Sequence, residues 1–195
     1  FTTRKGTSPT NSSGIIGYLA GSHGTATVTG AGSQWQQDGV LNVGFYGDGT
    51  LNIEQGGYVE SAGGHVASLS GSIGRVPVSD PGSHWNVLGD LYVGGTASGQ
   101  GGSALLDITN HGQVSVGGRM VVYPSGQLQV DQGGVLNLQG TYQGPALTVG
   151  PGGLLTGSGT AAIPVTVQGT ISGTGTYGAL TLSDGSTLAP GNSPG

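Results

Sequence analysis

The chain has 195 residues, of which 44 are glycine and only 7% are charged, and its formal net charge at pH 7 is -5. With only four Lys and Arg residues it lacks the clustered basic surface that nucleic-acid binding requires, and its lack of cysteine excludes disulfides and thiol chemistry. The glycines have no three-residue period, which excludes collagen, and 34% hydrophobic residues with so few charges are not typical of disorder.

Residues 1–14 contain no alternating apolar pattern. This segment is interpreted as a cap over the first structural unit, a tail, or a strand donated to a neighbour. Phe1 is typical of a processed or trimmed chain, and the turn-rich ending at Gly195 suggests a polypeptide that continues.

Residues 15–116 contain two copies of one phrase. Residues 32–35 (Gly-Ser-Gln-Trp) recur as residues 82–85 (Gly-Ser-His-Trp), and residues 39–44 recur as residues 89–94, always at an offset of 50. The offset then grows to 55, and the five extra residues fall in the polar run 96–102. A fixed period of this length predicts a stack of similar units in which insertions are confined to turns.

Residues 117–195 keep the alternation but lose the Trp phrase, and their units are shorter. No linker separates them from the preceding repeats. We therefore expect one continuous body with a change of repeat at about residue 117.

Short apolar-polar-apolar triplets recur along the whole chain, separated by Gly-Gly, Asp-Gly, Ser-Gly and Pro-Gly pairs. Such triplets predict short strands with the two outer residues on one face, and the pairs between them predict turns. No helical spacing is sustained, so the chain is predicted to be all-β. The triplets are 26–28, 41–43, 51–53, 76–78, 91–93, 114–116, 128–130, 136–138, 147–149, 165–167 and 180–182.

Strands this short favour a parallel β-helix, in which each strand pairs with the equivalent strand one coil later. We expect each 50–55-residue unit to form three coils of about 17–19 residues, and the chain to form roughly ten coils. The outer residues of each triplet would then stack as aliphatic columns in a narrow core.

These phrases resemble a known repeat. Residues 30–35, the following Gly-x-Leu-x-Val-Gly and residues 49–59 are similar to the repeat of bacterial type V secretion (autotransporter) passengers, which also occurs in PEP-CTERM surface proteins. Residues 180–195 resemble the autotransporter-associated β-strand repeat. The resemblance implies a right-handed parallel β-helix at the bacterial cell surface or outside the cell, with a role in adhesion, aggregation, biofilm or matrix building.

Nine carboxylates are candidates for glycosidase or polysaccharide-lyase chemistry, which needs acids that converge across neighbouring coils. Glu54 could approach Glu60, and Asp80 could approach Asp90, but no acid recurs at equivalent repeat positions. Solvated turn residues are therefore the favoured interpretation. The nine are Asp38, Asp48, Glu54, Glu60, Asp80, Asp90, Asp107, Asp131 and Asp184.

Other chemistry finds little support. The Asp-Gly turn at Asp48 occurs once, whereas calcium-binding nonapeptide turns repeat many times. The four histidines lack metal-ligand spacing, and His84 aligns with Gln34, which favours a surface position. No nucleophile elbow is present. We expect no catalytic, cofactor-binding or metal-binding residues.

The aromatic residues are the remaining candidates. Trp35 and Trp85 occupy the same place in the two copies. They could form an exposed row that stacks on sugars, or they could fill the core at equivalent places of a repeated fold. The Gly-Ser turn that is copied beside each tryptophan favours the core. Tyr92, in the middle of a triplet, should point outward as a contact residue. Trp35, Trp85 and Tyr92 are thus the candidate surface contacts.

The sequence favours a non-enzymatic extracellular rod, either an adhesin passenger or a self-assembling fibre subunit. Its expected partners are copies of itself, through head-to-tail or lateral association, or glycans of a cell surface or matrix. We expect no nucleic acid partner, and no membrane insertion because no apolar stretch is long enough. The alternative is a carbohydrate-active β-helix enzyme similar to a phage tailspike.

Overall fold

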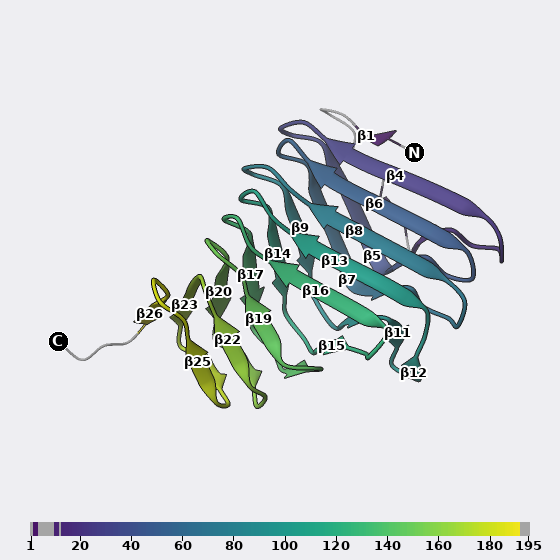
Figure 1. The fold of residues 1–195 in the computed structure, drawn as a ribbon. Helices are drawn as coiled ribbons and strands as arrows, with labels where there is room; N and C mark the ends of the chain where they lie inside the picture. Colours follow the sequence, from purple (N-terminus) through teal and green to yellow (C-terminus); the bar gives the residue numbers. More distant parts are fainter. Residues whose placement is uncertain (1, 4–9, 12, 192–195) are drawn as a thin grey trace.

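The computed structural model describes residues 2–3, 10–11 and 13–191, and all regular elements of this part are β-strands. A six-stranded sheet forms one layer and a larger sheet forms the layer behind it (Figure 1). The six-stranded sheet contains, in spatial order, β1 (Thr2–Thr3), β4 (His23–Thr29), β6 (Asp48–Glu54), β8 (Ile73–Val78), β13 (Ser103–Ile108) and β16 (Gly126–Val130).

The larger sheet has thirteen described strands. They are β2 (Thr10–Asn11), β3 (Gly14–Ile16), β5 (Gln34–Val43), β7 (Tyr58–Val66), β9 (His84–Val87), β10 (Leu91–Val93), β14 (Gln113–Val116), β15 (Met120–Val122), β17 (Val135–Leu138), β18 (Tyr142–Gln143), β20 (Leu154–Gly157), β23 (Thr170–Gly173) and β26 (Thr187–Pro190). Three small sheets are formed by β19 (Leu147–Val149), β22 (Val165–Val167) and β25 (Leu180–Leu182), by β21 (Thr160–Ala161) and β24 (Thr176–Tyr177), and by the hairpin β11 (Gly95–Thr96) and β12 (Gly99–Gln100). The hairpin is antiparallel, and the other described strand pairs are parallel.

The predicted triplets form these strands, and their alternation sets what is buried. In β6, Leu51 and Ile53 are fully buried and Asn52 between them points to the outer face. The outer residues of most other triplets are buried in the same way. Residues that stack on one another come from successive strands, as in the column Ala26, Leu51, Val76 and Leu106. The all-β prediction is confirmed.

The register shows what the repeat means in space. Thr25 pairs with Thr50, and Thr50 pairs with Arg75, so one step across the sheet is half of the offset between the two copies of the repeat. Trp35 likewise pairs with Val59, and Val59 with Trp85. One repeat therefore spans two steps, and the expectation of three shorter coils per repeat is wrong. The long β5 and β7 explain the difference, because each fills a whole side where a short triplet was expected.

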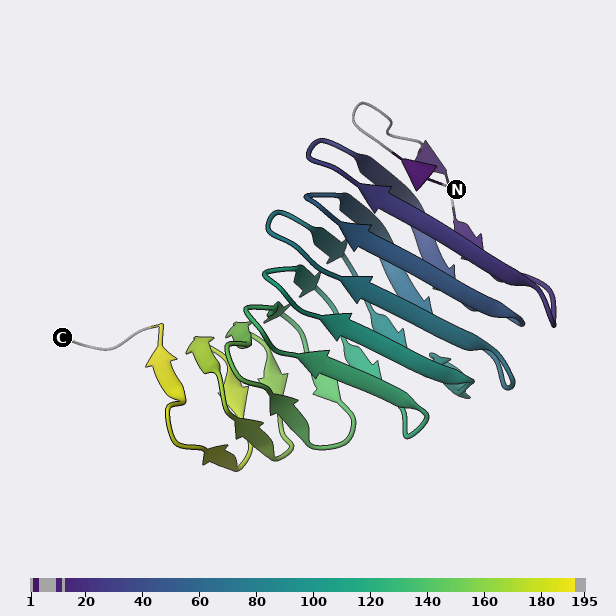
Figure 2. The ribbon, with the colours of Figure 1, turned by 45° about the horizontal axis from the view of Figure 1, so that its top comes forward.

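Later steps are shorter, and the body tapers accordingly. Leu155 pairs with Ile171 and Val165 with Leu180, so each of these steps takes far fewer residues than the step from Thr25 to Thr50. Figure 2 shows the long strands of the first half giving way to short strands near the C-terminus. The change of repeat expected near residue 117 thus corresponds to a narrower cross-section.

Glycine allows the turns to approach one another closely. Gly49 pairs with Gly24 on one side and with Gly74 on the other. A Cβ on Gly74 would lie 2.5 Å from the Ala67 nitrogen and from the Val43 oxygen, both of which are backbone atoms. The backbone therefore occupies the space of a side chain at this corner of each level.

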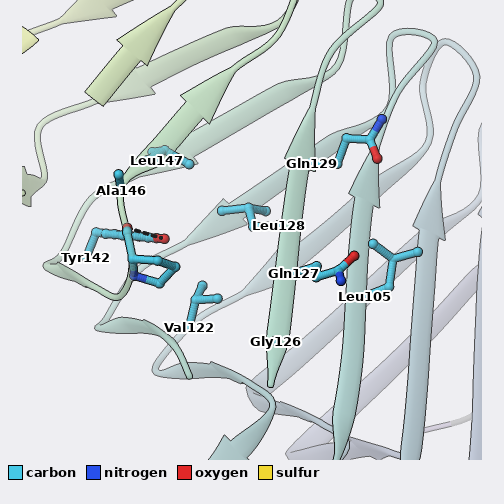
Figure 3. Close-up of a pocket in the computed structure, with 10 residues that line it drawn as sticks. Leu105, Val122, Gly126, Gln127, Leu128, Gln129, Tyr142, Ala146 and Leu147 are labelled. Atoms are coloured by element: carbon cyan, nitrogen blue, oxygen red, sulfur yellow. Dashed lines mark hydrogen bonds between the residues drawn. The ribbon is translucent and has the colours of Figure 1, made fainter. Parts of the chain in front are cut away.

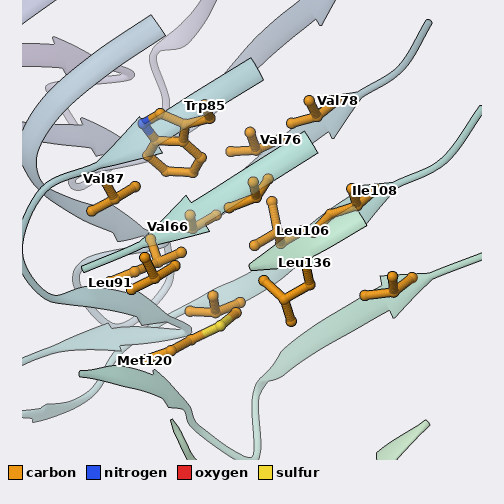
Figure 4. Packing of buried hydrophobic residues seen from close by; sticks show 14 of the residues in the cluster. Val66, Val76, Val78, Trp85, Val87, Leu91, Leu106, Ile108, Met120 and Leu136 are labelled. Carbon is orange, nitrogen blue, oxygen red and sulfur yellow. The ribbon is translucent and has the colours of Figure 1, made fainter. Parts of the chain in front are cut away.

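The core lies between the two layers and is continuous from Ile16 to Ile171. Trp85 packs there with Val76 and Leu106, as Figure 4 shows, and Met120 follows Leu91 in the same column on the next strand. At the C-terminal end the pattern changes, because Leu180, Leu182 and Leu188 are 36%, 49% and 47% exposed. These leucines stand at core-facing positions of the last described strands.

The segment 1–14 is described only in part. Its residues 2–3 pair with β4, and residues 10–11 pair with β5. Both short strands add to the N-terminal end of the sheets. Residues 1, 4–9 and 12, on which the choice between cap, tail and donated strand also depends, lie outside the described part.

Candidate functional site

Polar side chains gather on the outer face of the large sheet, where β7, β9 and β14 lie side by side. Tyr58 pairs with His84, and Glu60 with Asn86. Asn86 in turn pairs with Ser115. Because residues two apart point to the same face, all five side chains lie on the outer surface. We call Tyr58, Glu60, His84, Asn86 and Ser115 the polar cluster.

Glu60 is the acceptor at its centre. Its Oε2 accepts a hydrogen bond from the Tyr58 hydroxyl at 2.5 Å and another from Asn86 Nδ2 at 3.0 Å. These two bonds, in that order, hold the pKa of the Glu60 carboxyl below its ordinary value. Burial and the bond to Glu60 raise the pKa of the Tyr58 phenol. At neutral pH the carboxylate is therefore ionised and cannot act as a general acid.

His84 and Ser115 form the other half of the polar cluster. The His84 Nε2 lies 3.0 Å from the Ser115 Oγ, and the imidazole meets the Tyr58 ring edge-on with centroids 5.6 Å apart. Burial lowers the pKa of His84, so the ring is neutral at pH 7. The Glu60 carboxylate accepts its hydrogen bonds from Tyr58 and Asn86. It therefore does not orient the imidazole of His84 toward Ser115, as the acid of a hydrolase triad would. The arrangement suits hydrogen bonding better than nucleophilic attack.

Tyr92 lies further along the same sheet and corrects one prediction. It points away from the core, as expected, but it is only 4% exposed because neighbouring outer-face side chains cover it. The His65 ring meets it edge-on at 5.4 Å, and the Arg119 guanidinium lies 5.9 Å from its ring centroid. Tyr92 is therefore not an exposed contact residue. Sequence alternation gives the face of a side chain but not what the next strand places over it.

Arg119 and Asp90 make the ionic contact that covers Tyr92. The guanidinium donates from Nε and Nη2 to Asp90 Oδ2 at 3.0 and 2.7 Å, and Nη2 also contacts the Tyr92 hydroxyl at 2.7 Å. Burial alone would raise the pKa of Asp90, but hydrogen bonds from the Arg119 backbone, its guanidinium and Tyr92 outweigh it and lower the pKa. The carboxylate is ionised and fully engaged.

Both tryptophans belong to the core, so neither is a surface contact. Trp85 is fully buried and its Nε1 donates to the Ser61 Oγ at 3.1 Å, while Trp35 is 6% exposed. The interpretation as a repeated core plug is confirmed, and the exposed aromatic row is wrong.

Three of the four acids proposed as pairs have separate partners. Glu60 belongs to the polar cluster, whereas Asp80 accepts from the Gln55 backbone and from Asn110, and Asp90 binds Arg119. Asp48, in the isolated Asp-Gly turn, contacts His23 at 3.1 Å. Within the described ranges no group of three or more His, Asp and Glu residues could hold a metal ion.

One carboxylate pair was missed in the sequence. Burial and the charge of Asp131 raise the pKa of Asp107, and one oxygen of each carboxylate is buried without a hydrogen-bond partner. Gln129, which pairs with Asp107 across the sheet, donates to Asp131 Oδ2 at 2.7 Å. Asp107 lies on the outer face because it stands between the buried Leu106 and Ile108, but the long separation of the two acids in sequence concealed their proximity.

Comparison with known proteins adds no further identification. No family model, curated protein or solved structure matches this chain. The residues that the structure describes also contain no helix that is long and apolar enough to span a membrane.

Proposed function

We propose that this protein is a right-handed parallel β-helix that serves as an extracellular structural rod, either an autotransporter-like adhesin passenger or a fibre subunit. The parallel register supports the helix. One succession of neighbouring strands runs β3, β5, β7, β9, β14, β17, β20, β23 and β26 within the described chain. Nine levels are close to the roughly ten coils that we expect.

One observation carries the structural role: several polar groups of the outer face are bonded to the next level. Arg119 binds Asp90 across 29 residues of sequence, and His84 contacts Ser115 across 31. Asn86 reaches Glu60 across 26, and His65 reaches Asn42 across 23. Because each bond ties neighbouring levels together, these side chains stabilise the stack and are not left free to act on a substrate.

The mechanism of such a rod is geometric. Strand pairing repeated at every level gives a stiff spacer, and the weakly charged outer surface suits contact with neutral glycans or with identical rods.

The alternative is a carbohydrate-active enzyme, and the pair Asp107 and Asp131 favours it. A carboxyl with a raised pKa beside a second carboxylate is the arrangement of glycosidase acid–base catalysis. The two oxygens without hydrogen-bond partners are in keeping with this role. It ranks second because the adjoining groove presents amide and aliphatic groups rather than these acids.

Two measurements on the purified chain test the proposal. Limited proteolysis should leave residues 15–191 largely intact, and incubation with neutral and acidic polysaccharides should release no reducing or unsaturated ends. Sugar release that disappears in Asp107→Asn, but persists in the exposed control Asp38→Asn, would establish the enzyme instead.

A further inference from the structure

Three aromatic side chains gather at one corner of the first two described levels. Tyr18 lies in the turn between β3 and β4, and Phe45 and Tyr46 lie in the turn between β5 and β6. The Phe45 nitrogen donates to the Gly17 oxygen at 3.1 Å, which holds the two turns together. We call Tyr18, Phe45 and Tyr46 the aromatic cluster.

Phe45 contacts both tyrosines of the aromatic cluster. Its ring is nearly parallel to that of Tyr18, with an interplanar angle of 13° and centroids 5.8 Å apart, and it meets the Tyr46 ring edge-on at 5.0 Å. The outer two rings are open to solvent, since Tyr18 is 55% and Tyr46 is 50% exposed. Among the described residues neither tyrosine hydroxyl has a hydrogen-bond partner. The cluster therefore presents two ring faces and two free hydroxyls.

The second copy of the repeat forms the same turn without the ring of Tyr18. In the first copy the Ser22 nitrogen and hydroxyl both donate to the Leu19 oxygen, at 2.9 and 2.6 Å. Fifty residues later the equivalent serine donates in the same way to the equivalent leucine oxygen, at 3.1 and 2.7 Å. There the position of Tyr18 is taken by Ser68, which is 2% exposed. The turn thus needs no aromatic side chain.

The second copy also lacks the aromatic pair Phe45 and Tyr46. In both copies a glycine with positive φ, of 77° and 85°, follows the strand at this corner. The next two residues of the second copy are Gly95 and Thr96. Since the fold builds this corner without rings, the exposed rings of the first copy are better explained by a ligand than by packing.

We propose that the aromatic cluster binds a short stretch of a neutral glycan, whose sugar rings stack on the exposed faces of Tyr18 and Tyr46. A pyranose has an apolar C–H face, which suits an aromatic ring, and a rim of hydroxyls, which suits the free phenolic hydroxyls. Each tyrosine offers both kinds of contact from one side chain. This inference rests on the proposed extracellular role and assigns a location to glycan binding.

The surroundings favour a small uncharged ligand. None of the residues in the two turns, 17–22 and 44–47, is charged. Asp48, which follows the second turn, contacts His23 at 3.1 Å. With the 63% exposed Leu19 beside it, the cluster has only a few side chains to offer, whereas a stable protein interface uses roughly 20–30 residues from each partner. A few sugar rings match the size of this surface better than a second protein does.

The groove between β16 and β19 offers no comparable surface. Val122, Tyr142 and Leu147 are among the residues that line it (Figure 3). They are only 3%, 4% and 2% exposed, so no ring face is open to a ligand there. The Tyr142 hydroxyl also donates to the Pro145 oxygen at 3.4 Å. Stacking on a sugar therefore requires the exposed tyrosines of the aromatic cluster.

Titration of the isotope-labelled chain with cellotetraose, chitotetraose or mannotetraose, followed by NMR, tests the site. At least one of these sugars should shift the backbone amides of Tyr18 and Tyr46. Tyr18→Ser and Tyr46→Thr introduce the residues of the second copy, so both turns should still form. Each should weaken binding about ten-fold through the loss of one stacked ring, and the double variant should not bind. Tyr18→Phe, which keeps the ring, should weaken binding about five-fold at most.

Leu88→Ser is the matched control, because it removes a 57% exposed apolar side chain outside the cluster, and it should bind as the parent does. Amide spectra that are unchanged away from the two turns show that each variant is folded. Binding of none of the three sugars overturns the proposal, as does unchanged binding by the double variant or preferential binding of neutral phosphatidylcholine vesicles. Cleavage of a bound sugar would instead defeat the structural function and leave this location standing.

Discussion

The indole of Trp85 combines two kinds of stabilisation at one residue. Its rings fill the wide part of the core, and its nitrogen satisfies the buried Ser61 hydroxyl. The Gly-Ser turn that precedes each tryptophan is repeated because the core is equally wide two levels later. A large residue that recurs in the sequence therefore indicates that the core has the same width at both places.

Replacing Trp85 tests this role. Trp85→Ala should lower the free energy of unfolding by about 3–5 kcal/mol, because it leaves a cavity and an unpaired Ser61 hydroxyl. Trp85→Phe should cost less, since the ring still fills most of the space. Urea denaturation followed by circular dichroism measures both. Leu88→Ala, at a 57% exposed position, should change stability by less than ~0.5 kcal/mol, and an equal effect at both sites would contradict the core role.

Asp107 should destabilise the folded protein at neutral pH. Its folded-state pKa is raised, so its contribution favours folding at pH values below the unfolded pKa and is lost as the pH rises through the folded pKa. Asp107→Asn should therefore raise the melting temperature at pH 7. The gain in the free energy of unfolding should be well under ~1 kcal/mol, because solvent screens the charge. The gain should vanish near pH 3. A loss of stability at pH 7 would contradict the raised pKa.

Glu60 should have the opposite pH dependence. Its folded-state pKa is lowered, so it contributes stability above the unfolded pKa of about 4.3 that is lost as the pH falls through the folded value. Glu60→Gln should lower the melting temperature slightly at pH 7 and have no effect near pH 2. The loss in the free energy of unfolding should be below ~1 kcal/mol, because the Glu60 carboxylate is partly exposed to solvent. Thermal melts of the parent and of Glu60→Gln between pH 2 and pH 7 test this dependence. A difference in melting temperature that does not change with pH would show that folding does not favour the ionised form of Glu60.

Among the elements, the β11–β12 hairpin is the clearest insertion. Gly101 donates to the Gly94 oxygen at 2.7 Å, so the chain leaves the stack and returns to almost the same point. The hairpin is held from outside by the Tyr123 hydroxyl, which donates to the Thr96 oxygen at 2.7 Å. The predicted polar loop 96–102 is thus an ordered excursion.

Deletion of residues 95–100 should leave the fold intact. We expect unchanged far-ultraviolet circular dichroism per residue and a stability loss of about 1 kcal/mol, which corresponds to the Tyr123 bond. Removal of residues 103–108, which form β13, should abolish cooperative unfolding because this strand pairs on both sides. Equal tolerance of both deletions would contradict the distinction.

The strands were predictable from sequence because alternation is local, whereas their partners were not. The triplets 51–53 and 165–167 have buried outer residues as expected. The exceptions are Leu128 on β16, the last strand of its sheet, and Leu180 and Leu182 at the last described level, where no further strand is described. Likewise Tyr92 was assigned to the correct face, but its cover of His65 and Arg119 depends on register. The predicted length of a coil was wrong for the same reason, because it depends on which strands pair.

At the scale of the whole molecule, the last described level exposes apolar side chains that earlier levels bury. Leu182 and Leu188 are about half exposed on strands that have no charged residue to discourage edge pairing. We expect the isolated chain to self-associate through this end at high concentration.

Light scattering after size exclusion tests this association. The parent chain should show a mass that rises with concentration, and Leu182→Lys with Leu188→Lys should remain monomeric, because a buried lysine without a partner is costly. Ile15→Lys, at a 45% exposed position near the other end, is the control and should associate like the parent. Association that persists in the double variant would place the contact elsewhere, for example on the outer face of the large sheet.

The bonds between levels also determine how the molecule would respond to a pulling force. Tension along the stacking direction loads the strand pairs in series, so the level with the fewest bonds separates first. Such levels lie at both ends of the described chain, because β2 and β3 have two and three residues and β25 and β26 have three and four, whereas the ten-residue β5 lies between them. Under tension the levels at the two described ends should separate first, and the levels that contain the tryptophans should separate later.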